Sequence, residues 1–556
     1  MMKEPPFRLA FMKKILLLTY LGFFISSLGA QTTCRPVDRR LSANELSTTI
    51  NPLYLWWDGS DAQFNFPKNE STSMVFAGGL WLTAQYPDGV QESSVTVYGA
   101  AIDQFDFQTG PVGTGGSFTS SIYFCRSFKV TKQEIVAHLA DLADGTLDNP
   151  ISSIMEWPGR DNALLPVTAM GRDLAPFQDV DGNGRYQPAL GDYPMFNADE
   201  AVWWVTNDFG PHNESPGSGV GAEVQVLAQA FEAPDHPASK AQLYTVKVIN
   251  AADVTLDSLA LSLWIDPDVG CFTDDAIGSL PSHDAVFAYN IDAIDGTNGA
   301  ACDLGISTYA DKPPMIFFQT LSAFLDGAVV STRNSGISLN SRAVDGLPST
   351  YQPTIREEYF NVTHARWLDR EPLTFGNLGV GGTLPTNWIF SGNPSDSLAW
   401  SQCQNYSAID RRLLLNVNLQ DSFEEGAEFS VDFLVSIISD VPLPCPDLTT
   451  VIPTLDSIVD FVQNTVVSSN RTPRVSFKEL SLKPNPAKDA FSVSMGYGEA
   501  VLQTATLYDG LGRAVEQYGA ASLSGSIDVT PLPRGVYSLV AEDAKGDMYR
   551  SRVVLQ

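Results

Sequence analysis

The sequence predicts a mainly β protein, with a large β-rich core followed by a small C-terminal β-sandwich of immunoglobulin-like type. Short runs of apolar and β-branched residues recur along the chain, and glycine, proline and aspartate separate them, which is typical of strands joined by turns. Only two segments have the apolar spacing of amphipathic helices. The core, residues 31–465, could be one domain or two, with a division near residues 166–175.

Several segments of the core have the composition of strands. The segment Val75–Leu82 is apolar and contains two adjacent glycines, which indicates a buried strand with a glycine bend. Three further segments combine apolar and β-branched residues over the length of a strand. They are Leu243–Ile249, Leu256–Trp264 and Phe429–Ile438.

Two segments predict helices. Thr131-Lys-Gln-Glu134 has the form of a capping box, and the apolar residues Ile135, Val136, Leu139 and Leu142 then fall on one helical face. A second helix is expected to open at Pro453-Thr454, because proline is favoured in the first helical turn. Its apolar residues are Leu455, Ile458, Val459 and Val462.

The N-terminal residues 1–30 predict a signal peptide for the Sec machinery. Lys13 and Lys14 are basic, and the apolar run Ile15–Ile25 that follows them is too short to span a bilayer comfortably. Small residues then lead to a plausible cleavage point before Gln31. The sequence therefore predicts an exported protein.

The chain is strongly acidic. It holds 64 Asp and Glu residues against 34 Lys and Arg residues, for a formal net charge of −30. Because phosphate groups would be repelled, neither nucleic acid nor an anionic membrane is an expected partner. The acidity is compatible with cation binding, and equally with the general acidity of secreted proteins.

Six cysteines are present, namely Cys34, Cys125, Cys271, Cys302, Cys403 and Cys445. None forms a CxxC pair, so neither a zinc ribbon nor a thioredoxin-like redox site has support. An even number of cysteines in an exported chain favours disulfides. We expect sequential pairing, in which Cys271–Cys302 closes a short loop within one acidic segment.

The sharpest local motif is an acidic loop with alternating oxygen-bearing residues. Gly184 permits a tight turn at the sixth position, and the loop resembles the first half of an EF-hand or dockerin-like calcium loop. At the twelfth position, however, Leu190 replaces the usual acidic residue. The expected ligands of a structural Ca²⁺ are Asp179, Asp181, Asn183, the carbonyl of Arg185 and Asp192. The alternative is a hairpin whose Asp-Gly and Asn-Gly turns need no metal.

A second acidic cluster follows one of the predicted strands. Its members are Asp266, Asp268, Asp274 and Asp275. They could form another cation site, or they could be carboxylates that are simply solvated in a loop.

Enzyme motifs are scarce. The sequence contains no HExxH, GxSxG or P-loop motif. A glycosidase needs only two carboxylates roughly 5–10 Å apart, and Glu156 could supply one of them. Trp56-Trp57 and Trp203-Trp204 could each present one ring to a carbohydrate, because neighbours on a strand face opposite ways; the alternative is that these rings fill the core.

Residues 476–556 contain three motifs, within Leu482–Ala487, Leu507–Val515 and Leu532–Leu539. The residues that define them are Pro484, Asn485, Pro486, Tyr508, Asp509, Gly512, Arg513, Gly535 and Tyr537. Apolar residues alternate with polar ones in this segment, as at Phe491, Val493 and Met495, which predicts a small antiparallel sandwich. Residues 466–475 have the composition of a linker.

In order and spacing, these motifs resemble the type A C-terminal sorting domain of the type IX secretion system of Bacteroidota. The resemblance implies a protein that an outer-membrane translocon exports after recognising its tail, with a sorting-domain peptidase as a further partner. It places the protein outside the cell, released or attached to the outer-membrane surface, and implies nothing about activity.

The core is similar to a family of uncharacterised Bacteroidota surface or secreted proteins. The segments that carry this similarity include Ala77–Leu82, Ala175–Gly184, Gly191–Pro194, Ala201–Val205 and Tyr289–Asp292. The sequence thus predicts a calcium-stabilised, non-enzymatic protein that acts in adhesion, extracellular assembly or binding of a surface glycan or protein ligand. The alternative is an extracellular hydrolase of polysaccharide or protein.

Overall fold

The computed structural model describes residues 38–57, 64–98, 105–112, 122–297, 307–340, 347–404, 410–468, 478–495, 502–508, 514–543 and 548–556. They belong to two compact units, one ending at Ser469 and the other beginning at Asn470. The protein is mainly β, as predicted. The predicted signal peptide and most of the predicted linker lie outside the described residues. None of the described helices has both the length and the apolar character needed to cross a membrane.

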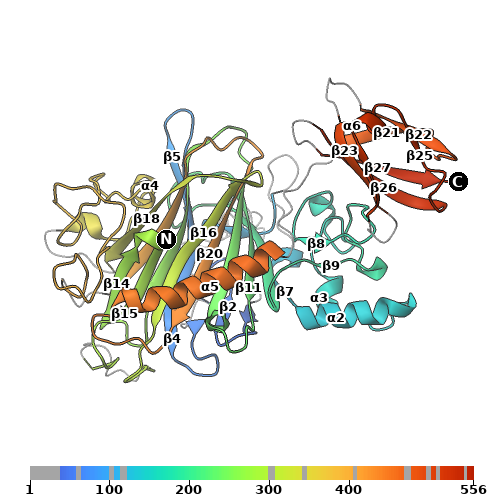
Figure 1. Ribbon diagram of the computed structural model, residues 1–556. Helices are drawn as coiled ribbons and strands as arrows, with labels where there is room; N and C mark the ends of the chain where they lie inside the picture. The colour runs from blue at the N-terminus through green and yellow to red at the C-terminus, as the bar shows by residue number, and fades with distance from the viewer. Residues whose placement is uncertain are drawn as a thin grey trace, which may run out of the picture. The chain divides into compact units, whose positions relative to one another are not determined.

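Two antiparallel sheets form the larger unit (Figure 1). The first sheet has the order β1-β2-β3-β4-β13-β19-β18, with β5 paired to β4. Its strands are β1 (Arg39–Leu41), β2 (Ser47–Ile50), β3 (Phe64–Asn65), β4 (Ser73–Gln85), β5 (Gln91–Val95), β13 (Asp257–Pro267), β18 (Thr332–Asn340) and β19 (Arg411–Leu419).

The second sheet has ten strands in the order β14-β15-β16-β20-β12-β11-β10-β6, with β17 paired to β16 and β7 to β10. Its strands are β6 (Gln108–Thr109), β7 (Phe128–Thr131), β10 (Glu200–Asn207), β11 (Ala222–Ala230), β12 (Ala241–Asn250), β14 (Asp275–Leu280), β15 (Ala285–Asn290), β16 (Met315–Leu325), β17 (Ala328–Val329) and β20 (Glu428–Ile438).

The two sheets share one hydrophobic core, so the larger unit is a β-sandwich. Along β13, Leu261, Leu263 and Ile265 enter this core, because alternate residues of a strand point to the same face. Val246 of β12 and Phe318 of β16 enter it from the ten-stranded sheet. The three further predicted strands and Val75–Leu82 are confirmed as parts of these sheets, although β13 begins one residue after Leu256.

Trp56 links the two sheets within this core. Its Nε1 donates a hydrogen bond to the Tyr244 hydroxyl of β12 at 3.0 Å. On the other side, a Cβ added to Gly78 of β4 would lie 2.2 Å from Trp56 Cε3, and one added to Gly79 would lie 2.6 Å from the carbonyl oxygen of Thr96. The adjacent glycines are therefore required for the close approach of this ring and of a neighbouring backbone.

Helix α5 (Leu448–Ser468) covers the outer face of the ten-stranded sheet (Figure 1). The helix itself is confirmed, but its predicted start is wrong, because it begins at Leu448 and contains Pro453 in its interior. Leu448 and Val451 pack against Phe317 of the sheet. The burial of these residues offsets the backbone hydrogen bond that proline cannot make.

Helix α2 (Lys132–Asp141) begins with the predicted capping box, formed by Thr131 and Glu134. Only part of the predicted apolar stripe is covered, since Ile135 packs against the cluster around Trp203 but Val136 and Leu139 are 62% and 40% exposed. His138 is buried instead, and its Nε2 lies 3.0 Å from the carbonyl oxygen of Pro188. The buried side of this helix therefore includes a polar contact with a neighbouring loop, which the apolar spacing does not indicate.

Trp203 and Trp204 point to opposite sides of β10, and both are buried. Trp204 belongs to the core between the sheets, whereas Trp203 belongs to a second cluster that α3 (Ser152–Met155) and nearby segments form over the outer face. Trp56 is also buried, and Trp57 is partly buried in edge contact with Tyr54 and Tyr98. Of the two interpretations of Trp203-Trp204, core filling is confirmed and a carbohydrate platform is excluded, because both rings are 2% exposed.

Cysteine pairing follows the sequential prediction where the described residues test it. Cys403 and Cys445 form a disulfide. Cys125 and Cys271 are also disulfide-bonded. Cys34 and Cys302 lie outside the described residues, so the pairing of Cys271 with Cys302 stays a prediction.

The C-terminal unit contains seven strands in the order β24-β23-β26-β27-β21-β22-β25. They are β21 (Lys478–Lys483), β22 (Ala490–Met495), β23 (Leu502–Tyr508), β24 (Ala514–Gly519), β25 (Ser526–Asp528), β26 (Gly535–Asp543) and β27 (Met548–Leu555), and helix α6 (Ala520–Leu523) follows β24. Phe491, Tyr549 and Val553 are buried in its core, and Val493 packs against it, as the alternation at Phe491 and Val493 predicts. The pairing of β21 with β27 is parallel, and the other described pairs are antiparallel.

Two of the sorting motifs lie at structural junctions of this unit. Asn485, between Pro484 and Pro486, accepts a hydrogen bond from the N–H of Val554 through Oδ1 at 2.9 Å. Gly535 begins β26, and the Tyr537 hydroxyl donates to the carbonyl oxygen of Pro533 at 2.7 Å. Tyr508 ends β23, whereas Asp509, Gly512 and Arg513 lie outside the described residues.

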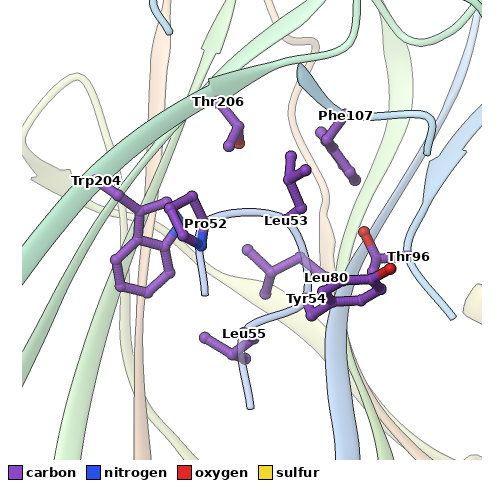
Figure 2. Close-up of a pocket in the computed structure, with 9 residues that line it drawn as sticks. All are labelled: Pro52, Leu53, Tyr54, Leu55, Leu80, Thr96, Phe107, Trp204 and Thr206. Carbon is purple, nitrogen blue, oxygen red and sulfur yellow. The ribbon is translucent and has the colours of Figure 1, made fainter. Parts of the chain in front are cut away.

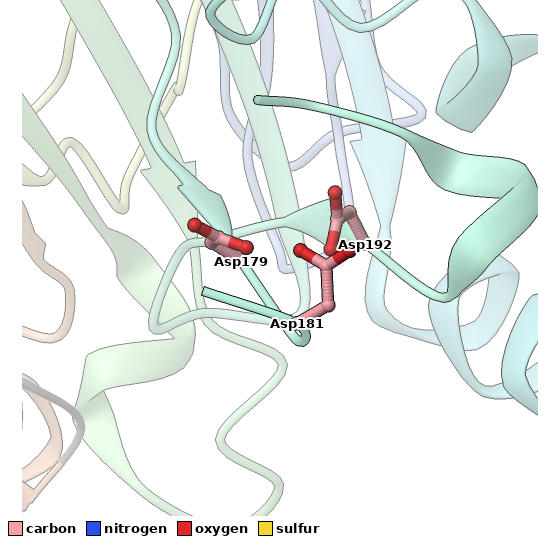
Figure 3. A group of neighbouring side chains, drawn as sticks. All are labelled: Asp179, Asp181 and Asp192. Carbon is pink, nitrogen blue, oxygen red and sulfur yellow. The ribbon is translucent and has the colours of Figure 1, made fainter. Parts of the chain in front are cut away.

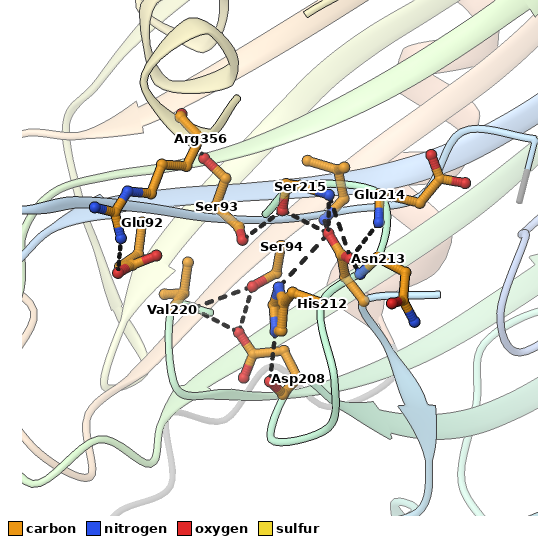
Figure 4. Close-up of polar contacts among 12 residues, drawn as sticks. Glu92, Ser93, Ser94, Asp208, His212, Asn213, Glu214, Ser215, Val220 and Arg356 are labelled. Atoms are coloured by element: carbon orange, nitrogen blue, oxygen red, sulfur yellow. Dashed lines mark hydrogen bonds and ion pairs between the residues drawn. The ribbon is translucent and has the colours of Figure 1, made fainter. Parts of the chain in front are cut away.

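Two buried aspartates connect the sheets of the larger unit at one end (Figure 4). Asp208 directly follows β10 and accepts a hydrogen bond from the Ser94 hydroxyl of β5 at 2.5 Å. It also accepts from three backbone N–H groups, those of Val220, Gly221 and Ala222. This carboxylate thus joins a loop of the ten-stranded sheet to a strand of the eight-stranded sheet.

Asp106 completes the connection. It accepts hydrogen bonds from the N–H of Val95 in β5 and from the N–H and hydroxyl of Ser215. His212 lies nearby, with Nδ1 3.6 Å from Asp106 Oδ2 and Nε2 2.8 Å from the carbonyl oxygen of Asp208. Ser215 is buried and donates directly to the carboxylate, so it serves the fold and not as a nucleophile.

The charge of His212 should make stability depend on pH. Burial lowers its pKa, but the nearby carboxylate of Asp106, together with the backbone carbonyl and charge of Asp208, outweighs burial and raises the pKa to about 9. The folded value lies above the unfolded value of about 6.5, so the stabilisation is complete below about pH 6.5 and is lost as pH rises through about 9. In urea unfolding across this window, the wild type should lose about 1–3 kcal/mol relative to His212→Gln.

The matched control is His283→Gln, which removes a histidine that contacts Asp456 outside this network. It should follow the pH dependence of the wild type. An unchanged pH dependence in His212→Gln would show that Asp106 does not hold a charged imidazole.

Candidate metal centre

The acidic loop joins two very short strands, β8 (Phe177–Gln178) and β9 (Tyr193–Pro194). Their pairing, Gln178 with Tyr193, brings the ends of the loop together. Asp179 and Asp192 directly flank this pair, and Asp181 lies on the loop between them. The carboxylates of Asp179, Asp181 and Asp192 converge, with one ligand atom from each lying within 4.8 Å of the others (Figure 3).

Hydrogen bonds fix the shape of the loop. Asp179 accepts from the N–H groups of Gly182, Asn183 and Gly184, at 2.7, 3.2 and 2.7 Å. Gly182 and Gly184 have φ values of 71° and 77°, which side chains other than glycine rarely adopt. The glycines therefore let the backbone curl around the carboxylate of Asp179.

Asp192 holds the opposite side of the loop. It is 1% exposed, and it accepts from the N–H groups of Val180 and Gln187 at 2.8 and 2.7 Å. Burial, together with the charges of Asp179 and Asp181, raises the pKa of Asp192. A bound cation would offset the free-energy cost of keeping Asp192 charged while buried, because it neutralises the three clustered carboxylates.

The residues fit a hard cation. The converging donors are all carboxylate oxygens, which Ca²⁺ prefers over nitrogen or sulfur. Leu190 is 60% exposed on a 3₁₀ turn, so the structure explains why Asp192 and not the twelfth loop position closes the group. Arg185 directs its Nε to Asp161 at 3.7 Å. Ligation by Asn183 and by the Arg185 carbonyl stays a prediction.

The second acidic cluster has different members from those that the sequence predicts. Asp266 and Asp268 come together with Asp410, and one ligand atom from each lies within 4.8 Å of the others. Ile265 of β13 pairs with Leu413 of β19, and continuing this register past the strands places Asp268 opposite Asp410. The sequence analysis missed Asp410, because only strand pairing reveals its proximity.

This second group already contains a positive charge. Arg412 Nη1 lies 3.0 Å from Asp266 Oδ1 and also pairs with Asp410. The Tyr98 hydroxyl donates to Asp266 at 2.5 Å, and burial raises the pKa of Asp266 to about 7. Because Arg412 neutralises part of the cluster, the loop around Asp179 is the stronger cation candidate.

Asp274 and Asp275 belong to neither carboxylate group among the described residues. Asp274 accepts from the N–H of Gly296 and Asp275 from the N–H of Val269, each at 2.7 Å. Each has one buried oxygen without a hydrogen-bond partner in the described part of the chain. Metal binding by this pair stays a prediction.

Residues whose chemistry could serve in catalysis have structural partners. Cys125 and Cys271 are in disulfides, so neither thiol is free to act as a nucleophile. Glu156 forms an ion pair with Arg126, at 2.7 Å between Nη1 and Oε2.

A small cavity lies at one end of the sandwich, beside Tyr54, Leu80 and Trp204 (Figure 2). Its volume is about 20 Å³, enough for a single water molecule and far too small for a sugar ring. It therefore reflects imperfect packing between the sheets.

Comparison with known proteins identifies the C-terminal unit. Residues 481–556 match the family described as the secretion system C-terminal sorting domain. The protein is therefore exported by the type IX system to the cell surface or the extracellular space. Its sorting domain interacts with the type IX machinery.

The core has weaker comparisons. A solved polysaccharide lyase aligns with 62% of this chain at 8% sequence identity, with a TM-score of 0.18. The chain covers 36% of that protein's length. Similarity at this level carries no argument about fold or activity. No curated protein matches the chain.

Replacing Asp181 with Asn should remove calcium binding at the loop. Asp181 is exposed, so the change should leave the folded apoprotein intact. Calorimetric titration of the wild type should show binding, and calcium at a hundred times the dissociation constant should stabilise it by about 2.7 kcal/mol. Asp181→Asn should lose this site and the corresponding rise in melting temperature.

The control is Asp253→Asn, which makes the same charge change at an exposed residue outside both groups. It should retain the response of the wild type. Absence of both heat and stabilisation in the wild type would refute the loop as a calcium site.

Proposed function

We propose that the core is a calcium-stabilised, non-enzymatic protein that binds a surface glycan or protein ligand in adhesion or extracellular assembly. Its route would begin with the Sec machinery and continue through the type IX translocon of a bacterium of the Bacteroidota. The sorting-domain peptidase would then process its tail.

The observation that carries this proposal is the convergence of Asp179, Asp181 and Asp192 at the ends of the β8–β9 ribbon. The loop also contacts α2, through the carbonyl oxygen of Pro188 and His138. A cation bound there would fix the segment that covers Trp203 on the outer face of the sandwich. The metal would thus stabilise the fold, as extracellular calcium commonly does.

Two further observations favour binding over catalysis. The cysteines of the described residues are held in disulfides. The carboxylates of Asp106 and Asp208 lie beside a histidine and a serine. Their oxygens accept hydrogen bonds from backbone N–H groups and buried hydroxyls. Both arrangements hold the fold together.

Deleting residues 476–556 should trap the protein inside the cell envelope. The sorting domain is the part that the type IX machinery reads, so the truncated chain should accumulate in the periplasm. Fractionation and immunoblotting of cells and medium would measure this. The full-length Asp253→Asn variant, as control, should leave the cell like the wild type. Normal extracellular amounts of the truncated protein would contradict the proposed route.

The mature protein should bind ligand without altering it. Glycan and peptide libraries should be screened for binding, and the same libraries should then be analysed for shortened products. Retention of intact ligand supports the proposal. Cleavage that Asp181→Asn leaves unchanged would establish the hydrolase alternative instead.

A further inference from the structure

A second, larger hollow lies where several strands of the eight-stranded sheet end. β4 ends at Gln85, which pairs with both Asp257 and Gln91, and β18 begins nearby in the sheet with Thr332 and Arg333. Helix α4 (Arg356–Thr363) and the loop after it form the other wall. The hollow has a volume of about 990 Å³, which is at the upper end of ligand sites in proteins.

Four arginines line this hollow, hereafter the arginine groove: Arg333, Arg356, Arg366 and Arg370. Glu357 is the acidic residue among the described lining residues, and it pairs with Arg356, which also pairs with Glu92. The other three arginines are exposed and form no ion pair within the described part of the chain. The groove is therefore a positive patch.

This patch is unusual for the chain that carries it. With 64 acidic residues against 34 basic ones, carboxylate partners are abundant, and yet three clustered arginines have none among the described residues. Because these arginines are exposed, water screens their mutual repulsion, and an anion in the groove would meet guanidinium groups that no described carboxylate already occupies.

The arginines stand on a rigid support. Arg366 and Arg370 belong to one turn, in which Arg366 Nη1 donates to the carbonyl oxygen of Arg370 at 3.0 Å. Trp367, between them, is buried and donates through Nε1 to the carbonyl oxygen of Gly379 at 2.8 Å. Arg333 Nη2 donates to Asn387 Oδ1 at 2.9 Å. Such preorganisation lowers the entropy lost when a ligand binds.

The pKa of His364 reflects the same concentration of positive charge. Its Nδ1 lies 2.7 Å from the carbonyl oxygen of Phe360, and its ring stacks on Phe360 at 4.1 Å. Burial lowers the pKa of His364, and the charges of Arg333 and Arg366 lower it further. The imidazole therefore stays neutral at physiological pH, and the arginines provide the charge.

We propose that the arginine groove binds a polysaccharide that carries carboxylate groups along its length. The planar guanidinium matches a carboxylate through two parallel hydrogen bonds. The amides of Gln85 and Gln91 also line the groove and are suited to sugar hydroxyls. Of the two rings in the described lining, Phe360 is 8% exposed and stacks on the partly buried His364, so guanidinium and amide groups dominate the groove.

This inference rests on the proposed binding role and names the class of ligand. The test uses the mature full-length protein with calcium and oligogalacturonate as the carboxylated probe, followed by calorimetry. We expect binding that weakens as salt concentration rises. The triple variant Arg333→Gln, Arg366→Gln and Arg370→Gln should bind at least roughly tenfold more weakly.

Two variants control for folding and for net charge. Lys68→Gln, Lys132→Gln and Lys312→Gln together remove the same charge at exposed residues outside the groove, and should bind within about twofold of the wild type. Changing the three groove arginines to Lys preserves charge but not the planar fork, and should restore only part of the affinity.

Other probes separate the outcomes. Stronger binding of a sulfated dextran or of polyglutamate than of oligogalacturonate would overturn the assignment, as would equal losses in the groove and control variants. Binding of only neutral glycans or proteins would overturn the groove inference and leave the proposed function standing. Shortening of oligogalacturonate by the protein would refute the non-enzymatic function itself.

Discussion

The structure depends on the burial of both faces of both sheets. The inner faces share one core, and α5, α4 and the segment containing α3 cover much of the outer faces. A sheet that is covered on both sides needs apolar residues at consecutive positions, as at Trp203 and Trp204. It also removes loops and strand ends from water, so a polar group in them that lacks a partner costs free energy.

The buried aspartates follow from this constraint, and they meet it in different ways. Asp208 and Asp106 accept several N–H and hydroxyl donors each, which disperses their charge over the surrounding backbone. Asp266 forms an ion pair with Arg412 and accepts a hydrogen bond from the Tyr98 hydroxyl. The carboxylates around Asp192 have backbone donors but gather three negative charges in one place, and this excess makes the loop the best cation candidate.

The protein combines two sites of opposite charge. The acidic loop packs against α2 beside the ten-stranded sheet, and the arginine groove lies at the end of the eight-stranded sheet. A cation at the loop would act on stability, because the loop closes a ribbon within the fold. An anion at the groove would act on recognition, because Arg333, Arg366 and Arg370 are exposed there. The sorting domain adds the location at which such recognition would take place.

The sequence by itself determined the β class, the capping box of α2, the sorting domain and the convergence of Asp179, Asp181 and Asp192. Each of these depends on neighbours close in the chain, or on motifs whose spacing is fixed locally. Tertiary structure alone decided that His138 and not Val136 faces inward, that α5 extends back through Pro453, and that Asp410 joins Asp266. It also brought together the strand ends and turns that form the arginine groove, which are spread over the sequence from Gln85 to Asn387. Pairing between distant strands and packing between layers bring these residues together. A local sequence pattern does not indicate which distant segments will come into contact.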